Sequence, residues 1–120
     1  MKHIARWPCF ALLLVACAAQ AQICAVPGDG SPLRRALLKV KYLPETELWE
    51  LATMKAAPVQ YLLSLDAPLK HRGRCYWPIE ARSAGQLWNR FYATPGGEHV
   101  LVAGPQGKLL TLNDWRRTSR

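Results

Sequence analysis

The chain has 120 residues, with 16 Lys and Arg against 8 Asp and Glu, and a formal net charge of +8. Half of the residues are apolar and a fifth are charged. This composition is that of one ordinary globular domain, and it excludes disordered, collagen-like and coiled-coil chains. The sequence contains no apolar run of about 18 residues, so we expect no ordinary transmembrane helix.

Residues 1–21 resemble a bacterial secretory signal peptide. A cationic start, Met1–Arg6, precedes the apolar stretch Trp7–Ala19, and Ala19–Ala21 is a small-x-small cleavage site. The apolar stretch is too short to span a bilayer permanently, and a buried N-terminal helix is the alternative interpretation. We expect export to remove the signal and leave 22–120 as a single small domain.

Leu14–Cys17 resembles the lipobox of bacterial lipoproteins, in which the cysteine becomes the lipid-bearing first residue of the mature chain. Cleavage before Cys17 would tether the protein to a membrane through acyl chains. Cleavage after Ala21 would release an unanchored protein, with Cys17 an ordinary member of the signal core. Both cleavages predict a periplasmic or secreted protein, the first of them at the outer membrane through a lipid anchor.

Two cysteines, Cys24 and Cys75, follow the predicted signal. An even pair in an oxidising compartment predicts a disulfide, with two unpaired thiols as the alternative. A zinc site is not expected, because the chain has no C-x-x-C motif and His71 and His99 lie at no ligand spacing.

The first half of the mature chain predicts helices. Residues 22–31 form a loop with turn chemistry, and Ser31 and Pro32 supply a predicted N-cap and first helical residue. Helical spacing of apolar residues follows over 32–41, although its last residues also fit a strand. A second helix is predicted over 45–57, ended by Pro58.

The second half alternates with period two, which predicts strands. The expected strands cover 59–65, 75–82, 87–94, 100–103 and 109–112. The basic segment 70–74 is predicted as a connector, and Pro78 places its strand at a sheet edge. A helix beginning at 83 is the alternative for the third strand, and 114–120 is expected to fray apart from Trp115. The predicted fold is α+β: one or two N-terminal helices on a four- to five-stranded, mainly antiparallel sheet with one disulfide.

The chain offers weak signals for catalysis. Glu98 and His99 follow a turn, and with Glu80 and a nearby arginine they would make an acid/base set for phosphodiester transfer. The alternative is that Glu98 and His99 are exposed residues at a strand start. Gly104–Lys108 lacks the spacing of a phosphate loop and is interpreted as a turn. No catalytic residue, metal or cofactor is therefore assigned.

Alternation predicts a binding face on the sheet. With Trp77, Ile79, Leu87 and Phe91 facing inward, the opposite face is rich in aromatic and arginine side chains, as binding surfaces are. The residues of this predicted face are Tyr76, Arg82, Trp88, Arg90 and Tyr92. The alternative is that helices cover this face as a second core layer.

Lys70, Arg72 and Arg74 form a basic cluster that predicts anion binding, with a solvated loop as the alternative. The leading hypothesis is an exported envelope protein that acts as a non-catalytic binding or accessory module, in envelope or secretion machinery or as an inhibitor or immunity protein. Its expected partner is an envelope or secreted protein, or an anionic envelope polymer, and not nucleic acid. The alternative is a small secreted basic hydrolase, such as a nuclease, using Glu98, His99 and Glu80.

Overall fold

The computed structural model describes residues 24–118; the predicted signal peptide and Cys17 lie outside this range. The described chain begins with two helices, α2 (Ser31–Lys41) and α3 (Pro44–Thr53). The strands are β1 (Val59–Leu63), β2 (Leu69–His71), β3 (Arg74–Ser83), β4 (Gln86–Ala93), β5 (Val100–Ala103) and β6 (Leu109–Thr111). Two short 3₁₀ turns, η2 (Pro95–Gly97) and η3 (Pro105–Gly107), flank β5, and α4 (Leu112–Thr118) follows β6.

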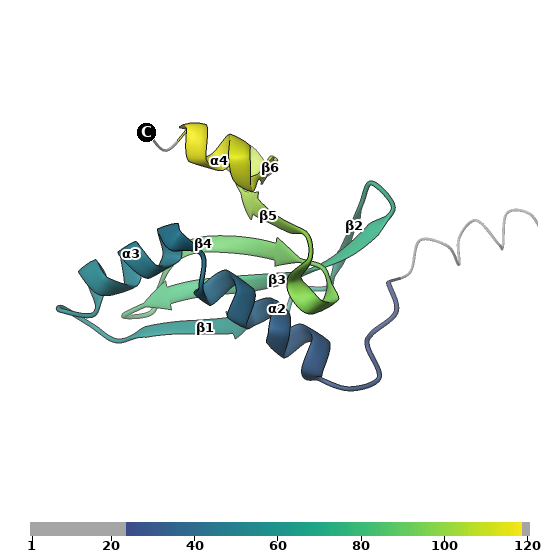
Figure 1. The fold of residues 1–120 in the computed structure, drawn as a ribbon, viewed down its shortest axis with the longest axis horizontal. Coiled ribbons are helices and arrows are strands. Elements are labelled where there is room, and N and C mark those ends of the chain that lie inside the picture. Colours follow the sequence, from purple (N-terminus) through teal and green to yellow (C-terminus); the bar gives the residue numbers. More distant parts are fainter. Residues whose placement is uncertain (1–23, 119–120) are drawn as a thin grey trace, which may run out of the picture.

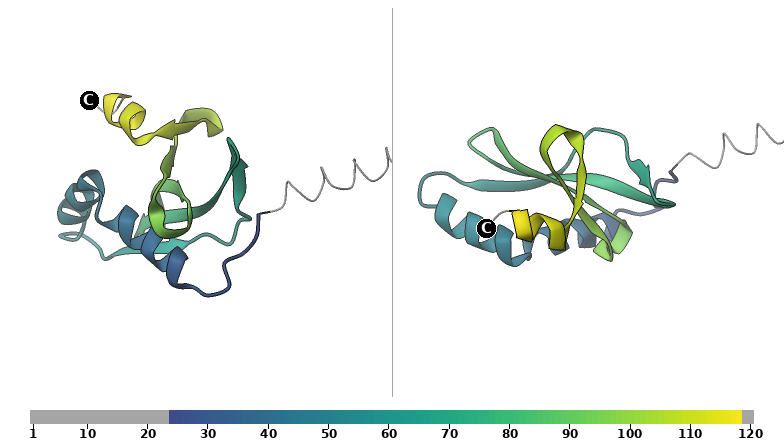
Figure 2. Two further views of the ribbon diagram at one scale, coloured as in Figure 1. Left: turned by 45° about the vertical axis from the view of Figure 1, so that its right-hand side comes forward. Right: turned by 90° about the horizontal axis from the view of Figure 1, so that it is seen from above.

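The strands form one six-stranded antiparallel sheet in the order β1-β3-β4-β5-β6, with β2 paired to the start of β3. The three helices lie on one side of this sheet (Figures 1 and 2). The predicted α+β fold, with two N-terminal helices on an antiparallel sheet, is therefore confirmed. The sheet has one strand more than expected, and α4 is an additional helix.

The predicted disulfide is also confirmed. Cys24 and Cys75 are bonded, with 5.7 Å between their Cα atoms, across a sequence separation of 51 residues. A cross-link over such a loop stabilises a domain by about 4 kcal/mol in the chain-entropy model. Because Cys75 stands opposite Lys70, the bond fastens the segment before α2 to the base of the β2–β3 hairpin.

Both predicted helices form, with small differences at their ends. Helix α2 begins at Ser31, but the side chain that accepts a hydrogen bond at its start is that of Asp29, from the Ser31 N–H at 2.6 Å. Helix α3 ends at Thr53, four residues before the predicted end. The N–H groups of Ala56 and Ala57 both donate to the Thr53 carbonyl. Because the ring of Pro58 disfavours helical geometry in the residue before it, the helix does not continue to Ala57.

The core lies between the helices and the sheet. Ala36, Val40 and Leu43 of the helical segment pack on Ile79 and on further buried residues of β3, β4 and β5, namely Ala81, Phe91, Ala93 and Val102. These strand residues share one face by register. We call this the helix-covered face, and the opposite side of the sheet the helix-free face, because no helix within residues 24–118 lies over it (Figure 2).

The expected edge position of Pro78 is wrong, because β3 pairs with β4 on one side and with β1 and β2 on the other. Pro78 is tolerated inside the sheet because of where its missing N–H would point. Its carbonyl accepts the N–H of Ser64, and the two polar groups of one strand residue point to the same side. Ser64 lies just past the end of β1, before β2 begins. The missing N–H of Pro78 would therefore point to the segment between these two strands, where β3 has no strand partner on that side.

A bulge in β4 reverses two predicted orientations. Ala81 pairs with Asn89 and Arg82 with Leu87, which leaves Trp88 as an extra residue. One extra residue exchanges the faces of the side chains beyond it. Trp88 therefore packs on the helix-covered face, whereas Leu87 is 44 % exposed.

The reoriented Trp88 is the centre of an aromatic cluster that joins three parts of the fold. Its ring stacks on that of Trp49 of α3, with 4.5 Å between centroids, and meets the edge of Trp115 of α4 at 6.2 Å. Trp115 also contacts Phe91 at 5.7 Å. The segment expected to fray is thus a helix as far as Thr118, packed on the sheet through the aromatic residue that the sequence singled out.

Candidate functional site

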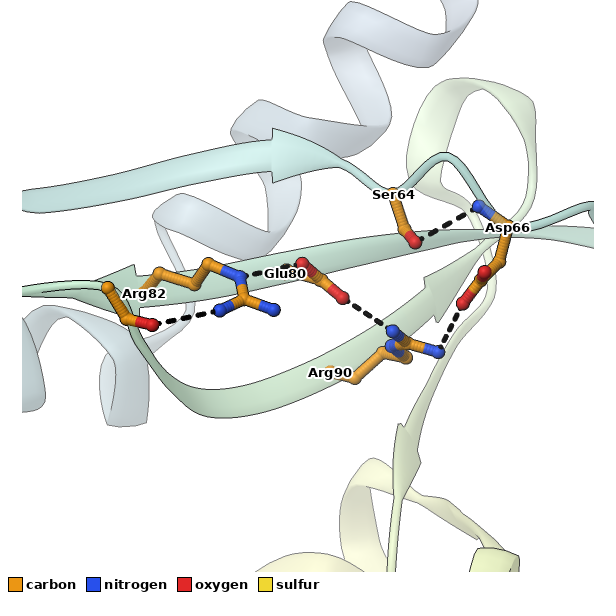
Figure 3. Close-up of polar contacts among 6 residues, drawn as sticks. Ser64, Asp66, Glu80, Arg82 and Arg90 are labelled. Carbon is orange, nitrogen blue, oxygen red and sulfur yellow. Dashed lines mark hydrogen bonds and ion pairs between the residues drawn. The ribbon is translucent and has the colours of Figure 1, made fainter.

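The helix-free face carries a buried carboxylate held by two arginines. Glu80 is only 4 % exposed, and its Oε1 accepts Arg82 Nε at 2.8 Å while its Oε2 accepts Arg90 Nη2 at 2.5 Å. Arg90 Nη1 donates in turn to Asp66 Oδ2 at 2.9 Å, and Arg82 Nη1 to the Gly85 carbonyl at 3.2 Å. Figure 3 shows these side chains lying across β3 and β4 in one connected network.

The network fixes the charge states of its members. Hydrogen bonds from Arg82 and Arg90 hold the pKa of the Glu80 carboxyl below its ordinary value. The Glu80 carboxylate likewise raises the pKa of Arg90. Glu80 is therefore a permanent anion near neutral pH, with both oxygens engaged, and it offers no proton for acid catalysis.

The predicted catalytic set is not brought together. His99 stands opposite Thr94, whose N–H donates to its carbonyl, whereas Glu80 stands opposite Arg90. Thr94, the residue after the end of β4, follows Arg90 by four residues, a separation of about 13 Å at the rise of an extended strand. Glu98 and His99 are both exposed, as the alternative interpretation of a strand start expected.

The predicted binding face is assembled in part. Register places Arg90 and Tyr92 on the helix-free face with Glu80, and Tyr76 lies on the same side of β3. Trp88 lies on the opposite side. The two arginines are half-buried and paired with carboxylates rather than fully exposed, which makes this a rigid polar surface and not a set of free side chains.

A groove of about 880 Å³ opens between the β2–β3 hairpin and the β5–β6–α4 segment. Tyr76 and Leu101 line it; because Leu101 pairs with Tyr92, the groove continues the helix-free face. The ring of His71 meets that of Tyr76 edge-on at 6.2 Å. The groove thus joins residues of the helix-free face, Tyr76 and Leu101, to residues of α4, which lies on the helix-covered side.

Basic residues dominate the groove. Five Lys and Arg side chains line it against two acidic ones: Arg72, Arg74, Lys108, Arg116 and Arg117 against Glu98 and Asp114. Arg117 pairs with Asp114, and Arg116 pairs with Glu45 of α3. Arg72, Arg74 and Lys108 make no ion pair with any carboxylate in 24–118, so their charges are available to a ligand.

The β2–β3 hairpin presents two of these charges. The segment 70–74, expected as a connector, is a hairpin whose turn residues Arg72 and Gly73 both have positive φ, at 50° and 80°. Turns of this hand match the twist of the flanking strands. Of the predicted anion-binding residues, Arg72 and Arg74 line the groove, whereas Lys70 is exposed on β2 and is not among its lining residues.

That Lys108, Arg116 and Arg117 join Arg72 and Arg74 in one groove was not predicted. The first three come from the β5–β6 turn and α4, and no local pattern indicates that these segments close over the hairpin side of the sheet. Within residues 24–118, no cluster of three or more His, Cys, Asp or Glu suits a metal ion, and no helix has the length and apolar character to cross a bilayer.

Comparison of the chain with protein-family models, with curated proteins and with solved structures finds no match in any of the three.

Proposed function

We propose that the chain is an exported envelope protein that acts as a non-catalytic binding module for an anionic envelope polymer. The observation that carries this proposal is the basic groove, in which Arg72, Arg74 and Lys108 form no ion pair within residues 24–118. Unpaired cations lining a concave surface attract anionic ligands and raise their local concentration.

Export is supported by two independent features. Residues 1–21 resemble a signal peptide, and the Cys24–Cys75 disulfide is typical of proteins that mature in an oxidising compartment. Outside the cytoplasm, the abundant polyanions are cell-wall polymers and lipopolysaccharide, which explains the choice of ligand class over nucleic acid.

A binding rather than catalytic role is supported by the state of the polar groups. Glu80 is held by two guanidinium groups, and it lies on β3, apart from Glu98 and His99, which precede β5. A surface whose arginines are already fixed loses little side-chain entropy when a ligand binds. The rigid face beside the groove is therefore suited to recognition.

The proposal is tested by titrating residues 22–120, which contain the disulfide and every described helix and strand, with a lipid-free anionic cell-wall polymer. Arg72→Gln/Arg74→Gln is expected to weaken binding at least tenfold, and added salt to weaken binding of the unsubstituted protein. The matched control is Arg34→Gln/Arg35→Gln, which removes the same charge from exposed positions of α2.

Equal losses in the two variants would show that net charge rather than the groove attracts the polymer, and would contradict the proposal. A hydrolytic activity abolished by His99→Ala in a folded protein would favour the hydrolase instead. Capture of an envelope protein that Arg90→Ala abolishes, without any polymer binding, would shift the ligand class to a protein partner on the helix-free face.

A further inference from the structure

The outer surface of the helical layer is unusually apolar. Eight large apolar side chains are notably exposed in residues 24–118, and five of them lie on α2, on α3 or next to these helices: Leu38, Tyr42, Leu48, Leu51 and Met54. Leu48 and Leu51 are each 69 % exposed and Tyr42 is 62 % exposed. Exposed apolar residues gathered on one surface are typical of a site that binds a protein or a membrane.

Basic residues accompany these apolar ones. Helix α2 contains no acidic residue, and Arg34, Arg35 and Lys39 are exposed on the same stripe as Leu38 and Tyr42, at helical spacing. Helix α3 carries three acidic residues: Glu47 is exposed, Glu50 is half-buried and Glu45 is paired with Arg116. The α2 part of the surface is therefore cationic as well as apolar, and α3 adds exposed apolar residues to it.

A shallow hollow lies within this surface. It measures about 560 Å³, with Leu38, Tyr42 and Leu43 as its apolar part and Arg35 and Lys39 as basic members, and Gly96 of η2 completes it. Basic groups beside an apolar depression match the layering of a lipid monolayer, in which anionic headgroups lie above acyl chains.

We propose that the outer surface of α2 and α3 docks on the surface of an anionic lipid bilayer. The charge of α2 complements acidic headgroups, and the exposed leucines and Tyr42 reach the headgroup boundary. A bilayer requires no matching shape, only apolar side chains beside cationic ones; α2 and its C-cap residue supply both around the hollow, and α3 adds Leu48 and Leu51. Since the helices and the helix-free face lie on opposite sides of the sheet (Figure 2), docking would leave that face directed away from the membrane.

The test is cosedimentation of oxidised residues 22–120 with vesicles of phosphatidylcholine alone or mixed with phosphatidylglycerol. We expect stronger binding to the mixed vesicles. Arg34→Gln/Arg35→Gln should lower that binding about 25-fold, at about fivefold for each charge removed. Leu38→Ser/Leu51→Ser should lower it about tenfold or more for each residue. These positions are exposed, and circular dichroism checks that each variant is folded.

The control is Arg72→Gln/Arg74→Gln, which removes the same charge from the groove and should leave vesicle binding unchanged. The proposal is overturned if the protein ignores mixed vesicles, if the control loses as much binding as the α2 variant, or if Leu38→Ser/Leu51→Ser binds normally. Polymer binding through the groove is measured without lipid, so either proposal can fail while the other stands.

Discussion

The two faces of the sheet bury their residues by different means. On the helix-covered face, Ile79, Phe91 and Val102 are fully buried against apolar groups of α2 and other elements. On the helix-free face, Glu80 is almost as deeply buried, but under two arginines. A buried ion pair often contributes no more to stability than apolar residues of similar volume. The first face therefore accounts for the fold, whereas recognition is the role that we propose for the charges of the second.

The most direct way to break this comparison is to truncate adjacent residues of β4 that point to opposite faces. Phe91→Ala removes a fully buried ring and should lower the free energy of unfolding by about 4 kcal/mol. Tyr92→Ala truncates a half-buried ring and should cost about 2 kcal/mol or less. Urea unfolding followed by circular dichroism measures both, and equal losses would show that both faces are core.

The next effect comes from the buried carboxylate itself. Glu80→Ala leaves Arg82 and Arg90 without their shared acceptor and should lower the free energy of unfolding by about 3 kcal/mol. Asp66→Ala is the control: it removes the other partner of Arg90, whose side chain is 64 % exposed, and should cost less than about 1 kcal/mol. A loss for Glu80→Ala no larger than for the control would mean that the network is not a structural unit.

These residues also show how far the sequence could predict the fold. The helical spacing of α2, the alternation of β1 and β3 and the even cysteine pair were sufficient for the architecture. The period-two alternation assigns Trp88 to the wrong face of the sheet. A bulge arises from the pairing of two strands, and the sequence of one strand does not reveal it. Strand β2 is three residues long, too short for a periodic pattern, and its Arg-Gly turn is not among the strongest hairpin signals.

The candidate site was predicted less completely than the fold. Arg72 and Arg74 were identified by local charge, but Lys108 and Arg116 join them only because β6 and α4 return to the same end of the sheet. The sequence also placed Arg82 and Arg90 on one face without indicating that both pair with Glu80. Such pairing depends on the β3–β4 register, which the loop and bulge set together.

The pH dependence of stability sharpens the contrast between the faces. The pKa of Glu80 is held below its ordinary value of 4.5 by Arg82 and Arg90. A carboxyl whose pKa is lower in the folded state contributes stability above its unfolded pKa, and this contribution disappears as the pH falls through the folded value. Between pH 7 and pH 3 the urea midpoint of the unsubstituted protein should therefore fall more than that of Glu80→Gln. Parallel curves would contradict the assignment.

The smallest expected effect tests how α4 is held on the helix-covered side. Arg116 contacts Glu45 through two hydrogen bonds, at 2.7 and 3.2 Å, but both side chains are about a third exposed. Arg116→Ala should cost less than about 1 kcal/mol at low salt and nothing measurable at high salt.

The matched change is Trp115→Ala, which removes the contacts of α4 with Trp88 and Phe91 and should expose the α4 amides to hydrogen exchange. If Arg116→Ala opened α4 as far as Trp115→Ala does, the ion pair rather than aromatic packing would hold the helix. The helix-covered face would then depend on charge as the helix-free face does. If the loss of stability in Arg116→Ala stays small and disappears at high salt, ion pairs cover buried residues on the helix-free face only.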